Sequence, residues 1–222
     1  MNAVTIPPAE TRRTVTYLFD PLCGWCYGAS PTIGRLGEQP GMELVLAPTG
    51  LFAGEGARTM DAAFADYAWS NDMRIEKLTG QRFTEAYHTR ILGQPGGRFD
   101  SAAATLALTA VALAAPEREL EVLKLLQEAR YVHALDTSTL PVVIRLLRDA
   151  GLDAAADRLA ASDAELLATN AARIRDARGM MQSMGAQGVP ALVIHEGSGG
   201  RLLRGDALYG SFDRLLSAIA AA

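Results

Sequence analysis

Short apolar runs and longer stretches of helical periodicity alternate along this chain. Near the N-terminus, residues 14–19 and 42–47 are nearly continuous in β-branched, aromatic and aliphatic side chains, which predicts two buried strands. Between them we expect a helix from about Cys23 to Glu38, with Pro31 inside it. A strand, a helix and a strand at this spacing predict a βαβ unit with a right-handed crossover.

Strand patterns are almost missing from residue 56 to residue 184. Apolar residues recur there at helical spacing, and glycine and proline interrupt them at intervals. Ser162 and Glu165 form a capping-box pattern before the last and longest of these helices. The breaks predict consecutive helices ending near Gly80 and then at about 84–92, 102–115, 116–132, 138–150, 153–161 and 163–184.

Strand character returns near the C-terminus. Residues 191–195 and 201–204 flank a glycine-rich turn, which predicts a hairpin, and residues 211–221 follow as an amphipathic helix. The predicted fold class is therefore α/β, in the order βαβ, helices, αββα. Residues 14–55 and 185–222 would form one domain, with a helical insertion at 56–184 whose last helix (163–184) returns to it. Residues 1–13 read as a flexible arm.

The protein has two cysteines, Cys23 and Cys26, and they stand where the first helix should begin. At a helix N-terminus, unpaired N–H groups and the peptide dipoles favour an anion, here a thiolate, which is the form that attacks disulfides. Cys26 lies one turn further along the helix, where its sulfur could attack a mixed disulfide at Cys23 and release the substrate. This placement favours a redox-active pair.

Other uses of such a pair are possible. A structural zinc site needs four ligands, and His88, His133 and His195 stand at no ligand-like spacing, so we expect no metal. Haem attachment would need a histidine directly after Cys26. A disulfide across two residues closes too small a loop to stabilise the fold much. Inert buried thiols remain the plain alternative to redox chemistry.

Composition and charge limit the kinds of partner that the protein can bind. With 222 residues, of which 49% are hydrophobic and 21% charged, the chain can bury a substantial core, and a net charge of −4 argues against nucleic acid. The N-terminus lacks the pattern of a secretory signal, and no apolar run is long enough to cross a bilayer. We therefore expect a cytoplasmic protein without a membrane partner, and a lone cysteine pair in that compartment is usually catalytic or redox-sensing.

The segment Phe-Asp-Pro-Leu-Cys-Gly-Trp-Cys-Tyr-Gly (19–28) and the segment Gly-Val-Pro (188–190) carry a resemblance. Together with the element order they resemble the thioredoxin superfamily, and the helical insertion resembles its DsbA-like branch, including bacterial proteins described as predicted protein-disulfide isomerases. The resemblance extends over nearly all of the chain after Arg13. It implies a thioredoxin fold and a thiol-disulfide oxidoreductase or isomerase that needs no cofactor.

The resemblance also implies roles for particular residues. Cys23 would be the nucleophile and Cys26 the resolving thiol, and Val189 and Pro190 would be joined by a cis peptide bond beside the sulfurs. The Val189 backbone would then bind an extended substrate segment as a short added strand. Gly24 and Trp25 would offer backbone donors and an aromatic lid. Substrates would be protein or peptide thiols and disulfides, with glutathione or another thiol as a possible co-substrate. Without the cysteine pair, Val189 and Pro190 would be read as the start of an edge strand.

Two departures from the superfamily pattern bear on the chemistry. Relatives carry a buried carboxylate six residues before the first cysteine, where this chain has Tyr17, and Asp20 and Tyr27 are the nearby candidates to replace it. No histidine stands between the cysteines, so Cys23 should be less acidified than in strongly oxidising relatives. We therefore expect a potential in the reducing or middle part of the range of about −270 to −120 mV.

Two other functions stay open at this stage. One is a glutathione-dependent isomerase or transferase of the kappa or 2-hydroxychromene-2-carboxylate isomerase type, which shares the helical insertion but carries serine at the first catalytic position. The other is a peptide-binding module in which the cysteine pair acts as a redox switch.

Overall fold

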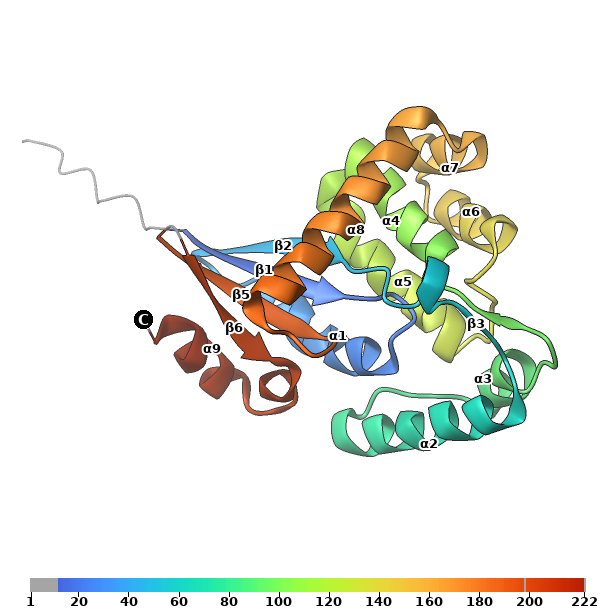
Figure 1. Ribbon diagram of the computed structural model, residues 1–222, viewed down its shortest axis with the longest axis horizontal. Coiled ribbons are helices and arrows are strands. Elements are labelled where there is room, and N and C mark those ends of the chain that lie inside the picture. Colours follow the sequence, from blue (N-terminus) through green and yellow to red (C-terminus); the bar gives the residue numbers. More distant parts are fainter. Residues whose placement is uncertain (1–11, 198, 222) are drawn as a thin grey trace, which may run out of the picture.

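A four-stranded sheet forms the centre of the α/β domain in the computed structural model, which describes residues 12–197 and 199–221 (Figure 1). The strand order is β2-β1-β5-β6. Strands β1 and β2 run parallel, whereas β5 is antiparallel to both of its neighbours. The bounds are β1 Arg13–Phe19, β2 Met42–Pro48, β5 Ala191–Glu196 and β6 Gly199–Arg204. The expected α/β thioredoxin fold with a helical insertion is confirmed.

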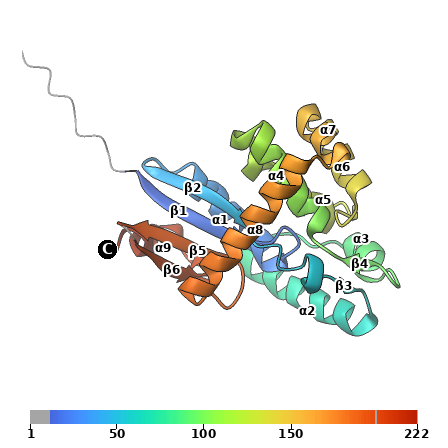
Figure 2. The same cartoon turned by 45° about the horizontal axis from the view of Figure 1, so that its top comes forward.

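Alternating side chains of β1 face two different helical layers. Tyr17 and Phe19 belong to the main core with α1 (Gly24–Gly37) and α9 (Phe212–Ala220), while Leu18 packs on the opposite face with α8 (Ala164–Met184). This period of two is what a strand buried on both faces requires. Figure 2 shows α8 crossing the sheet toward the helical segment. Most of the expected arm, residues 1–11, lies outside the described residues, and Arg13 begins β1.

The helical segment lies between β2 and β5 in the chain. It contains a two-residue strand pair that the sequence did not predict, in which β3 (Arg58–Thr59) at its start pairs with β4 (Arg98–Phe99) just before α4. Within the described residues, no helix has both the length and the apolar character needed to span a bilayer. The helices are α2 Ala62–Thr79, α3 Glu85–Tyr87, α4 Ala102–Ala114, α5 Glu119–Tyr131, α6 Leu140–Asp149, α7 Asp153–Ala161 and then α8.

Two helix boundaries differ from the expected ones. The helix expected at 84–92 is one short α-helical turn followed by a π-helical turn, His88–Leu92. The capping box expected at Ser162 and Glu165 is wrong, because Asp163 is the N-cap of α8 and accepts a 2.8 Å hydrogen bond from the N–H of Leu166. Ser162 instead ends α7 in the left-handed region, with φ of 47°, and an aspartate is as good an N-cap as a serine.

Helix α2 lies directly against the first turns of α1. A Cβ atom on Gly24 would come within 2.5 Å of Asp72 Oδ1, and one on Gly28 would come within 2.5 Å of Ile75 Cγ2. Both glycines therefore leave the space that side chains of α2 occupy. The cysteine motif is consequently packed against the helical segment as well as against the sheet.

Candidate active site

Cys23 is the N-cap of α1, directly after the turn that follows β1. Its backbone is extended, with φ of −80° and ψ of 116°, and the α1 N–H groups of the first turn lie next to it. Cys23 is 7% exposed and Cys26 is 1% exposed, and no disulfide joins them in this structure. The more exposed of the two cysteines is thus the one at the helix end.

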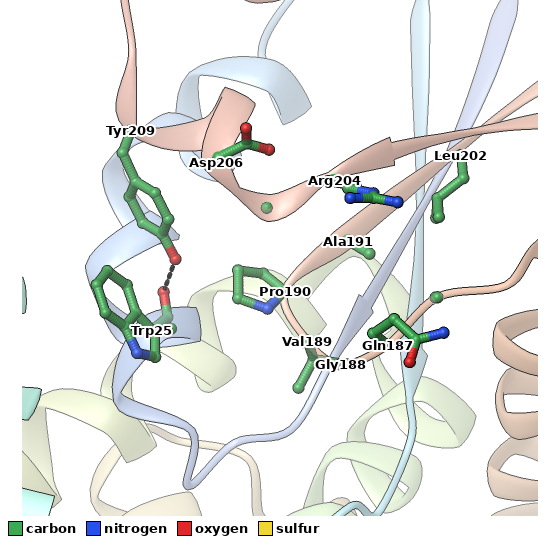
Figure 3. Close-up of a pocket in the computed structure, with 12 residues that line it drawn as sticks. Trp25, Gln187, Gly188, Val189, Pro190, Ala191, Leu202, Arg204, Asp206 and Tyr209 are labelled. Atoms are coloured by element: carbon green, nitrogen blue, oxygen red, sulfur yellow. Dashed lines mark hydrogen bonds between the residues drawn. The ribbon is translucent and has the colours of Figure 1, made fainter.

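The loop before β5 contacts Cys23. The peptide bond between Val189 and Pro190 is cis, and the Cys23 thiol donates to the Val189 carbonyl with an Sγ to O distance of 3.6 Å. Cys23 and Val189 thus meet although they are 166 positions apart in the chain. Figure 3 shows Val189 and Pro190 in this loop, near Trp25 of α1. The structure thereby brings together Cys23, Cys26, Val189 and Pro190, although their roles stay a prediction.

A pocket of about 270 Å³ opens beside Pro190. Its far wall is a 3-10 turn, Gly205–Tyr209, and the Tyr209 hydroxyl donates a 2.7 Å hydrogen bond to the carbonyl of Trp25 (Figure 3). The Trp25 and Tyr209 rings also pack edge to face, 5.4 Å between centroids. Arg204 and Asp206, both exposed, stand at the rim of this pocket. We call it the proline pocket.

A second pocket of about 210 Å³ lies on the other side of Trp25 and contains Cys23. Half of its lining residues are aromatic, and Asp72 is its one carboxyl group among the described residues. We call it the aromatic pocket. The remaining members include Phe52, Phe64, Tyr67, Tyr87, Phe99 and Tyr131. Cys23 therefore lines the aromatic pocket, while its thiol contacts Val189, which lines the proline pocket.

Asp20 holds the turn that leads to the cysteines. Its carboxylate accepts hydrogen bonds from the N–H of Leu22 at 2.9 Å, the N–H of Phe52 at 3.1 Å and the hydroxyl of Ser101 at 2.8 Å. Burial raises the pKa of Asp20, and these hydrogen bonds lower it in part. The carboxylate thus binds three chain segments, which occupies the oxygens that a proton acceptor for Cys26 would use.

Two tyrosines near the pair, Tyr17 at the position of the missing carboxylate and the candidate replacement Tyr27, keep their protons. Tyr17 is buried, its hydroxyl donates to the Cys26 carbonyl at 3.4 Å, and burial and then the Cys26 charge raise its pKa well above the usual value. Tyr27 stacks on Tyr131, and burial raises its pKa to about 12. Burial, and next the neighbouring Cys23, also raise the pKa of the Cys26 thiol.

Several residues of the site were not singled out in the sequence. Asp72 had a visible signal, because it continues the apolar stripe of α2 that runs through Ala65, Ala68 and Ile75 at helical spacing. A charged residue in such a stripe needs an explanation. Tyr209 and its neighbours had no such signal, because the 3-10 turn that places them follows no hydrophobic period. The described residues contain no cluster of His, Cys, Asp or Glu that could hold a metal ion.

Fold and site together define a thioredoxin-fold protein with a helical insertion and a cysteine pair at the start of its first helix. The DSBA-like thioredoxin domain family matches residues 14–219, so the chain belongs to that family. It is a family of DsbA-like thiol-disulfide oxidoreductases. A comparison with curated proteins found no match.

Solved structures of related proteins agree with this assignment. The cytosolic disulfide reductase DsbM from Pseudomonas aeruginosa is 30% identical, with a TM-score of 0.81 over 93% of this chain and 97% of that one. DsbM with GSH superposes with a TM-score of 0.79 over the same shares of the two chains, again at 30% identity. A 2-hydroxychromene-2-carboxylate isomerase, 14% identical with a TM-score of 0.57 over 93% of this chain and 94% of that one, shares the fold.

We expect Asp20→Ala to lower the free energy of unfolding by about 2–4 kcal/mol, because it leaves the N–H groups of Leu22 and Phe52 without an acceptor. Ser101→Ala removes one of the three donors to the carboxylate and should cost about 1 kcal/mol. Urea unfolding of the reduced proteins compares the two variants. Equal losses would show that the carboxylate does not hold the turn as described.

Proposed function

We propose that this protein is a thiol-disulfide oxidoreductase in which Cys23 attacks a substrate disulfide and Cys26 releases the product. The observation that carries the proposal is the Cys23 thiol at the N-terminus of α1, donating to the Val189 carbonyl beside the open proline pocket. A substrate segment that adds along the Val189 backbone would present its sulfur to Cys23 at this point.

The exchange transfers two electrons in two displacements. The Cys23 thiolate attacks one substrate sulfur, a Cys23–substrate disulfide forms, and the other substrate sulfur leaves as a thiolate and takes up a proton. Cys26 then attacks the Cys23 sulfur, so that the Cys23–Cys26 disulfide forms and the second substrate thiol leaves with the proton of Cys26. The substrate is reduced and the cysteine pair is oxidised.

The surroundings of Cys23 favour the reductive direction. A strongly oxidising pair is one whose reduced form is stabilised, chiefly by positive charge beside the thiolate. In the described part of the chain the aromatic pocket has no cationic side chain, and it carries the carboxyl group of Asp72. The high pKa of the buried Cys26 thiol likewise gives the reduced pair no stabilisation as a thiolate. We infer that the protein works as a disulfide reductase.

Glutathione is the co-substrate that suits the proline pocket. Its γ-glutamyl end carries a carboxylate and an ammonium group, which match the Arg204 and Asp206 side chains at the rim. Its peptide bonds can pair with the Val189 backbone, and its thiol would then face Cys23. The solved structure of DsbM with GSH supports this choice of thiol. A glutathione-linked reductase would act in the cytoplasm, where thiols are kept reduced.

Replacing each cysteine separately tests the two roles. We expect Cys23→Ser to abolish the reduction of a protein disulfide such as insulin, because the nucleophile is lost. Cys26→Ser should stop turnover but retain the first displacement, so that a Cys23–substrate disulfide accumulates and is detected by mass spectrometry. Glutathione-dependent turnover that survives Cys26→Ser would favour the isomerase or transferase reading. Unchanged biological activity of the double Cys23→Ser, Cys26→Ser variant would favour the redox-switched binding module.

The redox potential of the cysteine pair tests the direction of exchange. Equilibration of the pair in glutathione redox buffers, followed by alkylation of the remaining thiols, should give a potential nearer to about −270 mV than to about −120 mV. The reason is that no cation stabilises the reduced pair in the aromatic pocket as described above. A value near about −120 mV would place the protein among the oxidants.

Arg204→Ala should raise the KM for glutathione by roughly tenfold with little change in kcat, because the ion pair contributes to binding and not to exchange. Steady-state kinetics with glutathione as the varied substrate measure the effect. Arg90→Ala, also an exposed arginine but outside the proline pocket, is the matched control. If both variants bind glutathione like the wild type, the γ-glutamyl end lies elsewhere.

A further inference from the structure

Asp72 is a buried carboxyl group that shares a pocket with Cys23. It is 5% exposed and projects from α2 toward the start of α1, where a Cβ on Gly24 would lie 2.5 Å from its Oδ1 atom. Gly24 directly follows Cys23 in the chain, and both cysteine and carboxyl group line the aromatic pocket. The carboxyl group and the attacking cysteine therefore line the same pocket.

The two carboxyl oxygens of Asp72 have different surroundings. Oδ2 accepts a 3.1 Å hydrogen bond from the hydroxyl of Tyr87. Oδ1 accepts no hydrogen bond from any other residue in 12–197 or 199–221, and it is the oxygen that faces Gly24. One oxygen is thus fixed by the fold, and the other is available to a group inside the pocket.

The groups around Asp72 set its protonation. Facing it are Tyr87 from α3, Arg130 and Tyr131 from α5, and Cys23 at the start of α1. Burial raises the pKa of Asp72 to about 7, while the Tyr87 hydrogen bond and the Arg130 charge lower it in part. Arg130 is itself buried, and Asp136, 3.7 Å away, is its ion-pair partner. Both protonation states of Asp72 are therefore populated near neutral pH.

We propose that Asp72, as a carboxylic acid, gives a proton to the thiolate that leaves the substrate when Cys23 attacks. This inference rests on the proposed function. It assigns a general acid on the Cys23 side of the pair, separate from the proton of Cys26.

The steps balance without a further reactant. The Cys23 thiol first loses its proton to solvent, which leaves a thiolate in the same pocket as the carboxylic acid form of Asp72. The thiolate attacks, the substrate S–S bond breaks and the Cys23–substrate bond forms. The leaving thiolate takes the proton of the carboxylic acid, directly or through one water molecule, and the resulting Asp72 carboxylate regains a proton from solvent. Tyr87 keeps the carboxyl group oriented throughout.

Asp72→Asn separates this role from a structural one when two disulfides are compared. Oxidised glutathione releases an alkyl thiolate, which needs a proton, whereas an aromatic nitrobenzoate disulfide releases a thiolate that stays unprotonated at neutral pH. Both substrates are anionic, so the lost charge affects them alike. We expect single-turnover reduction of oxidised glutathione to slow at least about tenfold, with the aromatic disulfide nearly unaffected. Asp66→Asn, an exposed position on the same helix, is the control.

The pH dependence supplies an independent readout. In the wild type, the rate with oxidised glutathione divided by the rate with the aromatic disulfide should fall as pH rises through about 7, because the carboxylic acid disappears. The ratio should be flat in Asp72→Asn. Tyr87→Phe removes a hydrogen bond that lowers this pKa, so the fall should move to higher pH.

The outcomes are distinguishable. Equal slowing of both substrates by Asp72→Asn, or no slowing, would overturn the proton role while leaving the proposed oxidoreductase intact. If Asp72→Asn does not fold, the Tyr87→Phe shift decides the matter, and an unshifted profile counts against the inference. Failure of the wild type to reduce either disulfide would overturn the proposed function itself.

Discussion

The buried carboxylate of Asp20, through its hydrogen bonds, is the group on which the arrangement of the site depends. It binds the turn after β1, the loop after β2 and the residue that precedes α4, through Leu22, Phe52 and Ser101. These segments belong to the α/β domain and to the helical segment alike. Because the cysteine motif starts at this turn, one buried group determines both where the helical segment attaches and where α1 begins.

Two pockets with different chemistry flank Trp25 at this site. On one side of Trp25 the proline pocket offers a peptide edge and a charged rim, which suit the binding of an extended or γ-glutamyl chain. On the other side the aromatic pocket offers apolar walls around one carboxyl group. Binding and proton transfer would thus be supplied by different halves of the molecule, the sheet end and the helical insertion, and Cys23 lies where they meet.

Much of the fold could be predicted from the sequence because the patterns that indicate its strands and helices are local. Apolar runs placed β1 and β2, and the glycine-rich turn placed the β5–β6 hairpin, with Ser198 outside the described residues. The errors have local causes too: Asp163 and Ser162 are both good caps, and pattern alone could not choose between them. The two-residue pair β3–β4 is too short to show any alternation.

The site was predictable only in part. Cys23, Cys26, Val189 and Pro190 could be named from their motifs, whereas Tyr209 and Asp206 depend on how a 3-10 turn folds back onto α1. Asp20 was visible as a turn residue, but its partners Phe52 and Ser101 lie 32 and 81 positions away. Asp72 could have been noticed as a polar residue in an apolar stripe, but its approach to Gly24 depends on tertiary packing.

The contact between Gly24 and Asp72 links the redox dipeptide to the helical insertion. Any side chain at position 24 would have to displace the carboxyl group or the helix that carries it. Replacing the dipeptide formed by Gly24 and Trp25 with one that has a side chain at position 24 would therefore also disturb α2. A larger residue at position 24 would therefore have to be accompanied by a change in α2 that makes room for it.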